Sequence, residues 1–460
     1  MPEDRAAELA GHDRAYLIAA AGCGKTQVLC EGAGLSADGR QLVLTHTHAG
    51  VQAIRSRLQG LGVPAGKVRV ETIAGFCLRY AGSFPVTSSF EGAQPRADEW
   101  NEVYPAASRL IRSGVGSEIV KNSYSGVFVD EYQDCQIAQH DVVMALAEIL
   151  PCRLVGDPLQ AVFNFPKAPT IDWNKHVAPE FERLDDLTYP WRWKNANTEL
   201  GEWLGDARAR LSKGEAPDYA SGPITYGENS IASQIETCHR VADLDGSAIA
   251  IGHMASDAHD AAARLGGRFT SMEEMECADL IDGVARLEEP GPSRVANLID
   301  LAASCMTAVG VKLKAKRNAF ASGKVPKVTK RTSHPEVLES LIAVAESEAR
   351  GLIIPAMHGI ESILGSVLYR RELWRDLGRV VREGAKEADV PLSEIAWLVR
   401  DRWRHGGRAL DSHMVSRTLL IKGLEFDHAV VLNVDRLPSP ENTYVAITRG
   451  SKSLTVLASA

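Results

Sequence analysis

The chain has 460 residues, of which 45% are hydrophobic and 24% charged, an ordinary composition for a globular protein. Its length predicts two or three domains, and no apolar run reaches the roughly 18–20 residues needed to span a bilayer. A formal net charge of −8 argues against a protein that coats polyanions, although a local basic groove remains compatible with it. The eight cysteines form no Cys-x-x-Cys pair, so we expect neither a zinc site nor a disulfide framework, and a reducing cytoplasm fits.

The first chemical signal is the stretch LIAAAGCGKT at 17–26, where an apolar strand meets a turn of small residues. Such a turn lets backbone N–H groups close on phosphate oxygens, and the helix that follows adds its positive end. We predict a phosphate-binding loop in which Lys25 reaches the β- and γ-phosphates and the Thr26 hydroxyl ligates Mg²⁺. Ala19 stands where the strict signature has glycine, and a glycine-rich turn with a chance lysine is the alternative interpretation.

Cys23 lies inside this loop, at the start of the predicted helix and beside Lys25. Both features lower the pKa of a thiol, so we expect alkylation of Cys23 to block nucleotide binding. The alternative is that Cys23 is simply a small residue that fills the turn.

Further segments have the apolar, β-rich pattern of buried strands, at 41–45, 68–73, 126–129, 152–155 and 248–251. Helical periodicity lies between them, for example from Val51 to Leu58 and over 255–265. Alternating strands and helices predict an α/β fold with parallel sheets and helices on both faces. We expect a small helical insertion at about 80–125, a helix over 276–287 and a mostly helical module at about 290–410.

Asp130 and Glu131 directly follow the predicted strand at 126–129. A carboxylate at the carboxyl end of a strand beside the P-loop strand can hold Mg²⁺, and the next carboxylate can activate water. An exposed acidic turn is the alternative, but the P-loop in the same α/β segment favours the functional interpretation.

Eight segments in order resemble the motifs of superfamily 1A helicases of the UvrD/PcrA/Rep type. They lie at 19–26, 44–49, 71–76, 129–134 (VDEYQD), 154–163, 187–193, 418–427 and 444–449. The resemblance implies two RecA-like P-loop NTPase domains that bind ATP between them and carry single-stranded DNA across both. It covers both ends of the chain well and residues 270–410 poorly.

The resemblance also implies a domain organisation. The first RecA-like domain, 1A, would cover 1–185, with the small 1B-like insertion at about 80–125. The second, 2A, would combine 186–275 with 411–460, and a reduced 2B-like helical insertion would occupy 276–410.

Matching position by position, the resemblance assigns roles to individual residues. Nucleotide would be bound by Ala21, Gly22, Cys23, Gly24, Lys25, Thr26, Gln27, Trp191 and Glu425, and Mg²⁺ by Thr26 and Asp130. Glu131 would be the general base, Gln160 would sense the γ-phosphate, and Arg192 and Arg449 would be arginine fingers from the second domain. DNA would contact His46, Thr72, Phe163 and Phe165, the two phenylalanines by stacking on bases. The alternatives are surface ion pairs for the two arginines and core packing for the two phenylalanines.

The chain departs from this family in several places. No glutamine precedes Gln27, although the family has one there that reads adenine, and Gln27 itself replaces an arginine that stacks on the base. Trp191 replaces a tyrosine and can still stack, so ATP is the default nucleotide while the base preference stays open. Only eleven residues follow Arg449, where the family has a strand-separating hairpin, so translocation is implied but processive unwinding is not. The basic runs at 312–331 and 400–408 are either a solvated face or mobile linker, or a contact for duplex DNA or a partner through phosphates.

These features predict a cytoplasmic DNA-dependent ATPase that moves 3′→5′ on single-stranded or tailed DNA, with no membrane partner. The alternative is a DNA-sensing ATPase that signals to a partner nuclease, as in Gabija-type anti-phage defence systems, which the chain resembles in size and architecture. A P-loop GTPase or small-molecule kinase is disfavoured, because neither would need the motifs from 154 onward.

Overall fold

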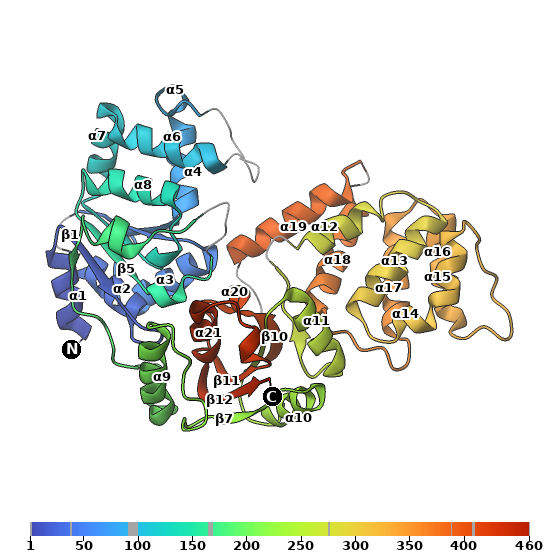
Figure 1. Cartoon of the computed structure of the whole chain (residues 1–460). Coiled ribbons are helices and arrows are strands. Elements are labelled where there is room, and N and C mark those ends of the chain that lie inside the picture. Colours follow the sequence, from blue (N-terminus) through green and yellow to red (C-terminus); the bar gives the residue numbers. More distant parts are fainter. Residues whose placement is uncertain are drawn as a thin grey trace. The chain divides into compact units, whose positions relative to one another are not determined.

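The computed structural model describes residues 2–36, 39–90, 100–163, 169–274, 277–387, 389–406 and 410–459. The chain divides into two compact units, which are described separately (Figure 1). The first combines Met1–Ile224 with Pro438–Ser453, and the second combines Thr225–Leu437 with Leu454–Ala460. Among the described helices, none has the length and apolar character that crossing a membrane requires.

The first unit is built on a six-stranded sheet with the order β3-β2-β4-β5-β1-β6. Its strands are β1 (Arg14–Ile18), β2 (Gln41–Thr45), β3 (Val68–Thr72), β4 (Gly126–Val129), β5 (Cys152–Gly156) and β6 (Glu182–Arg183). Each pairing in this sheet is parallel. The carboxyl ends of the strands therefore meet along one edge, which is where parallel α/β sheets bind ligands.

Helices cover both faces of this sheet because its central strands are apolar on both faces. In β2, Leu42 and Leu44 belong to one hydrophobic cluster and Val43 belongs to another, as the two-residue period of a strand requires. The Leu42 face packs against α4 (Ile73–Ser83), α6 (Trp100–Arg112), α7 (Gly114–Ser123) and α8 (Ile137–Ala147). The Val43 face packs against α1 (Pro2–Gly11), α2 (Lys25–Leu35) and α3 (His48–Gly60). With α5 (Pro85–Ser88), the described part of the insertion at 80–125 is helical, as predicted.

One expectation about this sheet is wrong. We expected the strand before Asp130 to lie beside the P-loop strand, but β5 lies between β4 and β1 and pairs with both. The ends of β1 and β5 remain close, because the Ala19 N–H donates to the Gly156 carbonyl at 2.9 Å. A Cβ on Gly156 would lie 2.6 Å from Gln133 Oε1, so this position requires glycine.

The second unit has its own six-stranded sheet, with the order β7-β12-β11-β8-β10-β9. Parallel pairing joins β12 to β7, β11 to β8, β10 to β8 and β10 to β9. The strands are β7 (Thr225–Glu228), β8 (Ala248–Gly252), β9 (Thr270–Ser271), β10 (His413–Arg417), β11 (Phe426–Val431) and β12 (Gly450–Ala458). The helices α10 (Ile231–Ala242) and α11 (Ala255–Arg264) share a hydrophobic cluster with β8, β10 and β11. Two parallel α/β sheets therefore confirm the predicted fold class.

Between β9 and β10 the chain forms a helical module with its own hydrophobic core, which runs from Cys277 to Val399. Its helices are α12 (Ala278–Ala285), α13 (Pro292–Cys305), α14 (Val309–Lys312), α15 (Lys314–Ala321), α16 (Pro335–Glu346), α17 (Ile353–Glu361), α18 (Arg371–Gly384) and α19 (Leu392–Gly406). The prediction of a mostly helical module is confirmed for the described residues.

The observed grouping of segments differs from the predicted domain boundaries at two places. Residues 186–224, which contain α9 (Thr198–Leu211), belong to the compact unit of the P-loop. So do residues 438–453, which contain α21 (Pro440–Ile447). The division into domains 1A, 2A and 2B remains a prediction from the sequence.

A buried ion pair joins the segment after β9 to the start of α18. Arg370 Nη2 lies 2.6 Å from Glu273 Oε2, and the two side chains are only 6% and 4% exposed. Burial lowers the pKa of Arg370, but the hydrogen bond and charge of Glu273 outweigh burial, and the net pKa is raised. Arg370 therefore stays charged, and the geometry of the pair offsets the cost of burying it.

We predict that Arg370→Ala destabilises the second unit by about 3–5 kcal/mol, because Glu273 would lose its buried partner. Urea unfolding of the purified chain measures the loss. Arg317→Ala is the control, since its pair with Asp300 is 39% and 44% exposed and should contribute far less. Equal losses for the two variants would contradict this account.

Candidate active site

The loop between β1 and α2 has backbone conformations that favour glycine. Gly22 has a φ of +68° and Gly24 a φ of +87°. A Cβ on Gly22 would lie 2.5 Å from Trp193 Cζ3, and a Cβ on Gly24 would lie 3.4 Å from Trp191 Cδ1. Two tryptophans therefore lie directly against the loop, which explains why its residues are small.

Lys25 and Thr26 begin α2 and face the two acidic residues that follow β4. Lys25 Nζ lies 2.5 Å from Glu131 Oε1 and 4.0 Å from Asp130 Oδ1. The Thr26 hydroxyl donates to Asp130 Oδ2 at 3.4 Å. Lys25 and Asp130 are 9% and 4% exposed, and charges this deep in a protein persist only when they are paired. The structure thus brings together the four residues that the sequence places in the P-loop and after β4.

Burial and the charges of neighbouring side chains shift the pKa values of Asp130 and Lys25. Burial raises the pKa of Asp130 to about 6, with Lys25 acting in the opposite direction. Burial lowers the pKa of Lys25, but the charges of Glu131 and Asp130 outweigh it and the net pKa is raised. Lys25 is consequently a cation at neutral pH.

Glu131 has an unusual backbone for a residue with a side chain, with a φ of +54°. Such conformations cluster at functional sites, where the surrounding structure holds them. Gln133 donates to Glu131 Oε2 and accepts from the Asp157 N–H at 2.9 Å through its own oxygen. Gln133 and Lys25 therefore both orient the Glu131 carboxylate.

The donor set fits Mg²⁺ and a nucleoside triphosphate. The Thr26 hydroxyl and the Asp130 carboxylate are hard oxygen ligands of the kind that Mg²⁺ prefers. Lys25 and the amides at the start of α2 suit phosphate oxygens. Within the described residues, no group of three or more His, Cys, Asp and Glu side chains is placed to hold a metal ion by itself. Mg²⁺ usually binds through one or two carboxylates together with substrate phosphates.

Asp157, at the end of β5, holds a second network that sequence reasoning missed. Asp157 is fully buried; its Oδ2 accepts from Gln160 Nε2 at 2.7 Å and its Oδ1 from Arg208 Nη1 at 2.6 Å. The Arg208 guanidinium lies 5.3 Å from the ring centroid of Tyr444, whose hydroxyl accepts from the Ala21 N–H at 3.1 Å. The network therefore connects Gln160 to the P-loop through α9 and α21.

Arg208 and Tyr444 are thus site residues that the motifs did not single out. Arg208 lies in α9, outside all eight motif-like segments, so the sequence carried no signal for it. Tyr444 opens the last of those segments, and its aromatic hydroxyl was the available signal.

The two predicted arginine fingers are both held near α21. Arg192 Nη1 donates to the Thr448 carbonyl at 2.8 Å, while its backbone N–H donates to the Gly22 carbonyl at 3.1 Å. Arg449 is 1% exposed, and its guanidinium donates to the Val445 carbonyl at 2.8 Å and to Thr448 Oγ1 at 2.9 Å. A surface ion pair is therefore wrong for Arg449. Both arginines belong to the compact unit of the P-loop, whereas the resemblance implied a separate domain.

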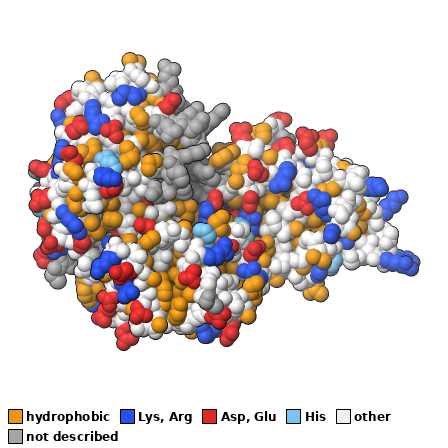
Figure 2. Space-filling model, in the orientation of Figure 1, with side chains coloured by type: hydrophobic (Ala, Val, Ile, Leu, Met, Phe, Trp, Pro, Cys, Tyr) orange, Lys and Arg blue, Asp and Glu red, His pale blue; other side chains and the backbone are white. Residues whose placement is uncertain are grey.

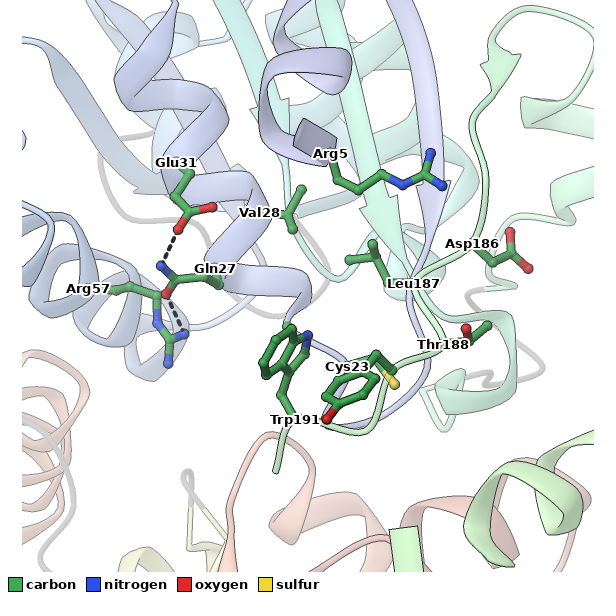
Figure 3. A pocket seen from close by; sticks show the side chains of 12 residues that line it. Arg5, Cys23, Gln27, Val28, Glu31, Arg57, Asp186, Leu187, Thr188 and Trp191 are labelled. Carbon is green, nitrogen blue, oxygen red and sulfur yellow. Dashed lines mark hydrogen bonds between the residues drawn. The ribbon is translucent and has the colours of Figure 1, made fainter. Parts of the chain in front are cut away.

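A pocket of about 620 Å³ opens beside the P-loop (Figure 3). Its lining residues are Arg5, Cys23, Gly24, Gln27, Val28, Glu31, Arg57, Asp186, Leu187, Thr188, Tyr189 and Trp191. The rings of Tyr189 and Trp191 lie 4.4 Å apart between centroids and are 50% and 42% exposed. Gln27 and Trp191, two predicted nucleotide-binding residues, therefore share one pocket next to the loop.

The remaining predicted residues are more scattered. Glu425 lies in the second unit, exposed in the turn between α20 (Thr418–Ile421) and β11. His46 follows β2, and its Nε2 lies 3.6 Å from Cys135 Sγ. Thr72 ends β3, and its hydroxyl caps α4 by accepting from the Gly75 N–H at 2.9 Å. Phe163 is half-buried after the 3₁₀ turn Pro158–Gln160, and Phe165 lies outside the described residues.

Comparison with protein families matches residues 96–175 to the family described as the UvrD/REP helicase N-terminal domain. The matched segment contains Asp130, Glu131, Asp157 and Gln160. A search of curated proteins finds no match.

The chain is similar to two solved structures of the helicase Arterivirus nonstructural protein 10. The complex of that protein with DNA is 14% identical over 55% of this chain and 51% of that chain, with a TM-score of 0.30. The structure of that helicase described without DNA is 11% identical over 99% of this chain and 61% of that chain, with a TM-score of 0.36. The chain thus spans about half to three fifths of the length of those helicase chains. Similarities at these TM-scores do not indicate its function.

The expectation of a reactive thiol at Cys23 is wrong. Cys23 is 4% exposed, and burial raises its pKa to about 12, outweighing the opposite influence of Arg208 and Arg192. Its Sγ lies 3.6 Å from the Ala21 carbonyl inside the loop. Cys23 is therefore a neutral thiol that fills the turn, as the alternative interpretation had it.

We predict that iodoacetamide at pH 8 labels Cys23 far more slowly in the folded chain than in urea, because the thiol is buried and protonated. Peptide mass mapping of a labelling time course measures the two rates. Fully buried Cys77 provides an internal control for protection by burial alone. Labelling of Cys23 at the same rate in both conditions would refute this assignment.

Proposed function

We propose that the chain hydrolyses ATP with Mg²⁺ and uses this cycle to move 3′→5′ along single-stranded DNA, as UvrD-like helicases do. The observation that carries the proposal is the placement of Lys25 and Thr26 against Asp130 and Glu131 at the carboxyl edge of the first sheet. The family match over 96–175 supports it, because that segment contains both carboxylates.

The proposed roles follow from the chemistry of these side chains. Mg²⁺, when bound, would be held by Thr26 and Asp130 and would neutralise charge on the phosphate oxygens. Lys25 would exchange its contact with Glu131 for the phosphates. Glu131 would then orient the attacking water and accept its proton.

Gln160, Arg192 and Arg449 would act on the transferred phosphoryl group. Preorganised donors that face developing negative charge lower the barrier to transfer. Two observations support this role: Gln160 shares Asp157 with Arg208, and α21 contacts the P-loop through Tyr444. The part played by Glu425, in the second unit, remains a prediction from the sequence.

DNA would bind along the carboxyl edge of the first sheet. His46 and Phe163 follow β2 and β5, and Thr72 ends β3; the carboxyl ends of these strands meet at that edge. The Thr72 hydroxyl already caps α4, so Thr72 would contribute through its backbone. Phe165 joins this group on the sequence alone. In the second unit, Figure 2 shows Lys and Arg side chains gathered at the end of the helical module that carries α15 and α16, which would suit phosphate contacts.

We predict that single-stranded DNA stimulates ATP hydrolysis by the purified chain. Phosphate release is measured with ATP and Mg²⁺, with and without an oligonucleotide, and strand separation is followed on a 3′-tailed duplex. Lys25→Ala is the control that removes phosphate binding. Stimulated hydrolysis without strand separation would favour the alternative, a DNA-sensing ATPase that signals to a partner nuclease in anti-phage defence. ATP hydrolysis that single-stranded DNA does not stimulate would contradict both hypotheses, the translocating ATPase and the DNA-sensing ATPase.

We predict that Glu131→Gln lowers kcat by about 10²–10⁴-fold, the usual contribution of a general base, while the Kd for ATP changes little. The amide keeps the shape of the side chain but cannot accept the proton. Single-turnover hydrolysis and equilibrium binding separate the two effects. Glu118→Gln, at an exposed position on α7, is the matched control. Substantial residual turnover would rule out Glu131 as the base.

A further inference from the structure

The pocket beside the P-loop combines an apolar floor with polar groups along one side. Val28 and Leu187 supply aliphatic surface, and Tyr189 and Trp191 supply aromatic rings. Gln27, Glu31 and Arg57 lie together on the α2 and α3 side (Figure 3). A largely apolar pocket with a few placed polar groups is the usual form of a specific small-molecule site.

The three polar residues form one hydrogen-bonded relay. Arg57 Nη1 donates to Gln27 Oε1 at 3.0 Å, and Gln27 Nε2 donates to Glu31 Oε1 at 2.6 Å. A guanidinium only donates and an ionised carboxylate only accepts, so its two neighbours set the direction of the Gln27 amide. Gln27 and Glu31 are also four residues apart on α2 and lie on the same helical face. The relay therefore fixes the Glu31 carboxylate in one orientation.

The second oxygen of Glu31 is buried, and among the described residues it has no hydrogen-bond partner. In Figure 3 this oxygen is on the Val28 side of the carboxylate, away from Gln27. The other arginine of the pocket, Arg5, is engaged elsewhere, with Glu8 at 2.7 Å and Asp185 at 3.0 Å. A buried acceptor without a donor is costly, so a ligand that brings a donor to Glu31 Oε2 would relieve that cost.

We propose that Glu31 selects the nucleotide base by accepting a hydrogen bond from an exocyclic amino group, the 6-amino group of adenine. This inference rests on the proposed function, because the P-loop must hold the triphosphate. Glu31 lies nearly two helical turns beyond Lys25, about 9 Å along α2, and lines the same pocket as Cys23 and Gly24 of the P-loop. The Arg57–Gln27–Glu31 relay would recognise the base with residues of α2 and α3.

The selection works through repulsion as well as attraction. A base with an amino group gives Glu31 Oε2 its missing donor. Inosine carries a carbonyl at the same position, which would set two acceptors against each other. Sites built to hydrogen-bond a polar group reject analogues that lack it, because the buried partner is left unsatisfied.

The test compares ATP with purine riboside triphosphate, which differs only in lacking the 6-amino group. Competition binding to the full chain with Mg²⁺ gives both Kd values, with inosine triphosphate as a third probe. We expect ATP to bind about 10- to 100-fold more tightly than purine riboside triphosphate, and inosine triphosphate to bind no better than the latter. In Glu31→Ala the difference between the first two should disappear, whereas Glu118→Gln should keep it.

Equal binding of ATP and purine riboside triphosphate to the wild-type chain would overturn the inference, and this comparison needs no variant to fold. Competition by inorganic tripolyphosphate tests the phosphate site independently of base recognition by Glu31. If tripolyphosphate competes and ATP binds no more tightly than purine riboside triphosphate, the phosphate site is supported and the role of Glu31 is refuted. If neither nucleotide nor tripolyphosphate binds, both the proposed function and the inference are refuted.

Discussion

The candidate site depends on one group of charges, buried Lys25 and Asp130 with the partly exposed Glu131. Removing the Lys25 ammonium and the Asp130 carboxylate from water costs several kcal/mol per ion, and only close, correctly oriented partners offset it. That constraint explains the local structure around them. Glu131 keeps a strained backbone, and Gln133 holds its second oxygen. Under the proposed function, an incoming phosphate would replace Glu131 as the partner of Lys25.

A second layer of buried polar groups supports the first. Asp157 accepts from Gln160 and Arg208, and Arg208 packs over the ring of Tyr444, whose hydroxyl contacts the P-loop. Since each member satisfies the next, the loop, β5, α9 and α21 act as one hydrogen-bonded assembly. This network connects the residues after β5 to the P-loop without requiring direct contact between them.

The same loop meets an apolar surface on its other side. Trp193 is buried against Gly22, while Trp191 lies at Gly24 and lines the pocket that contains Gln27 and Glu31. Gly22 is needed both for its positive φ and for the room that Trp193 occupies, whereas Gly24 is needed for its positive φ. The proposed phosphate site and the proposed base site are thus physically adjacent, with Lys25 and Thr26 of α2 at the first and Gln27 and Glu31 of α2 at the second.

The sequence by itself determined the elements and the chemistry of the P-loop. The strands at 41–45 and 126–129 and the helices of the insertion were readable, because periodicity and residue type act locally. Lys25, Thr26, Asp130 and Glu131 were readable too, because the first two begin the helix after a loop of small residues and the last two directly follow a strand. Only the tertiary structure decided that β5 separates β4 from β1, that burial keeps Cys23 protonated, and that Arg208, Tyr444 and Glu31 join the site. Those facts depend on which distant segments meet in the folded chain, and no local pattern encodes that.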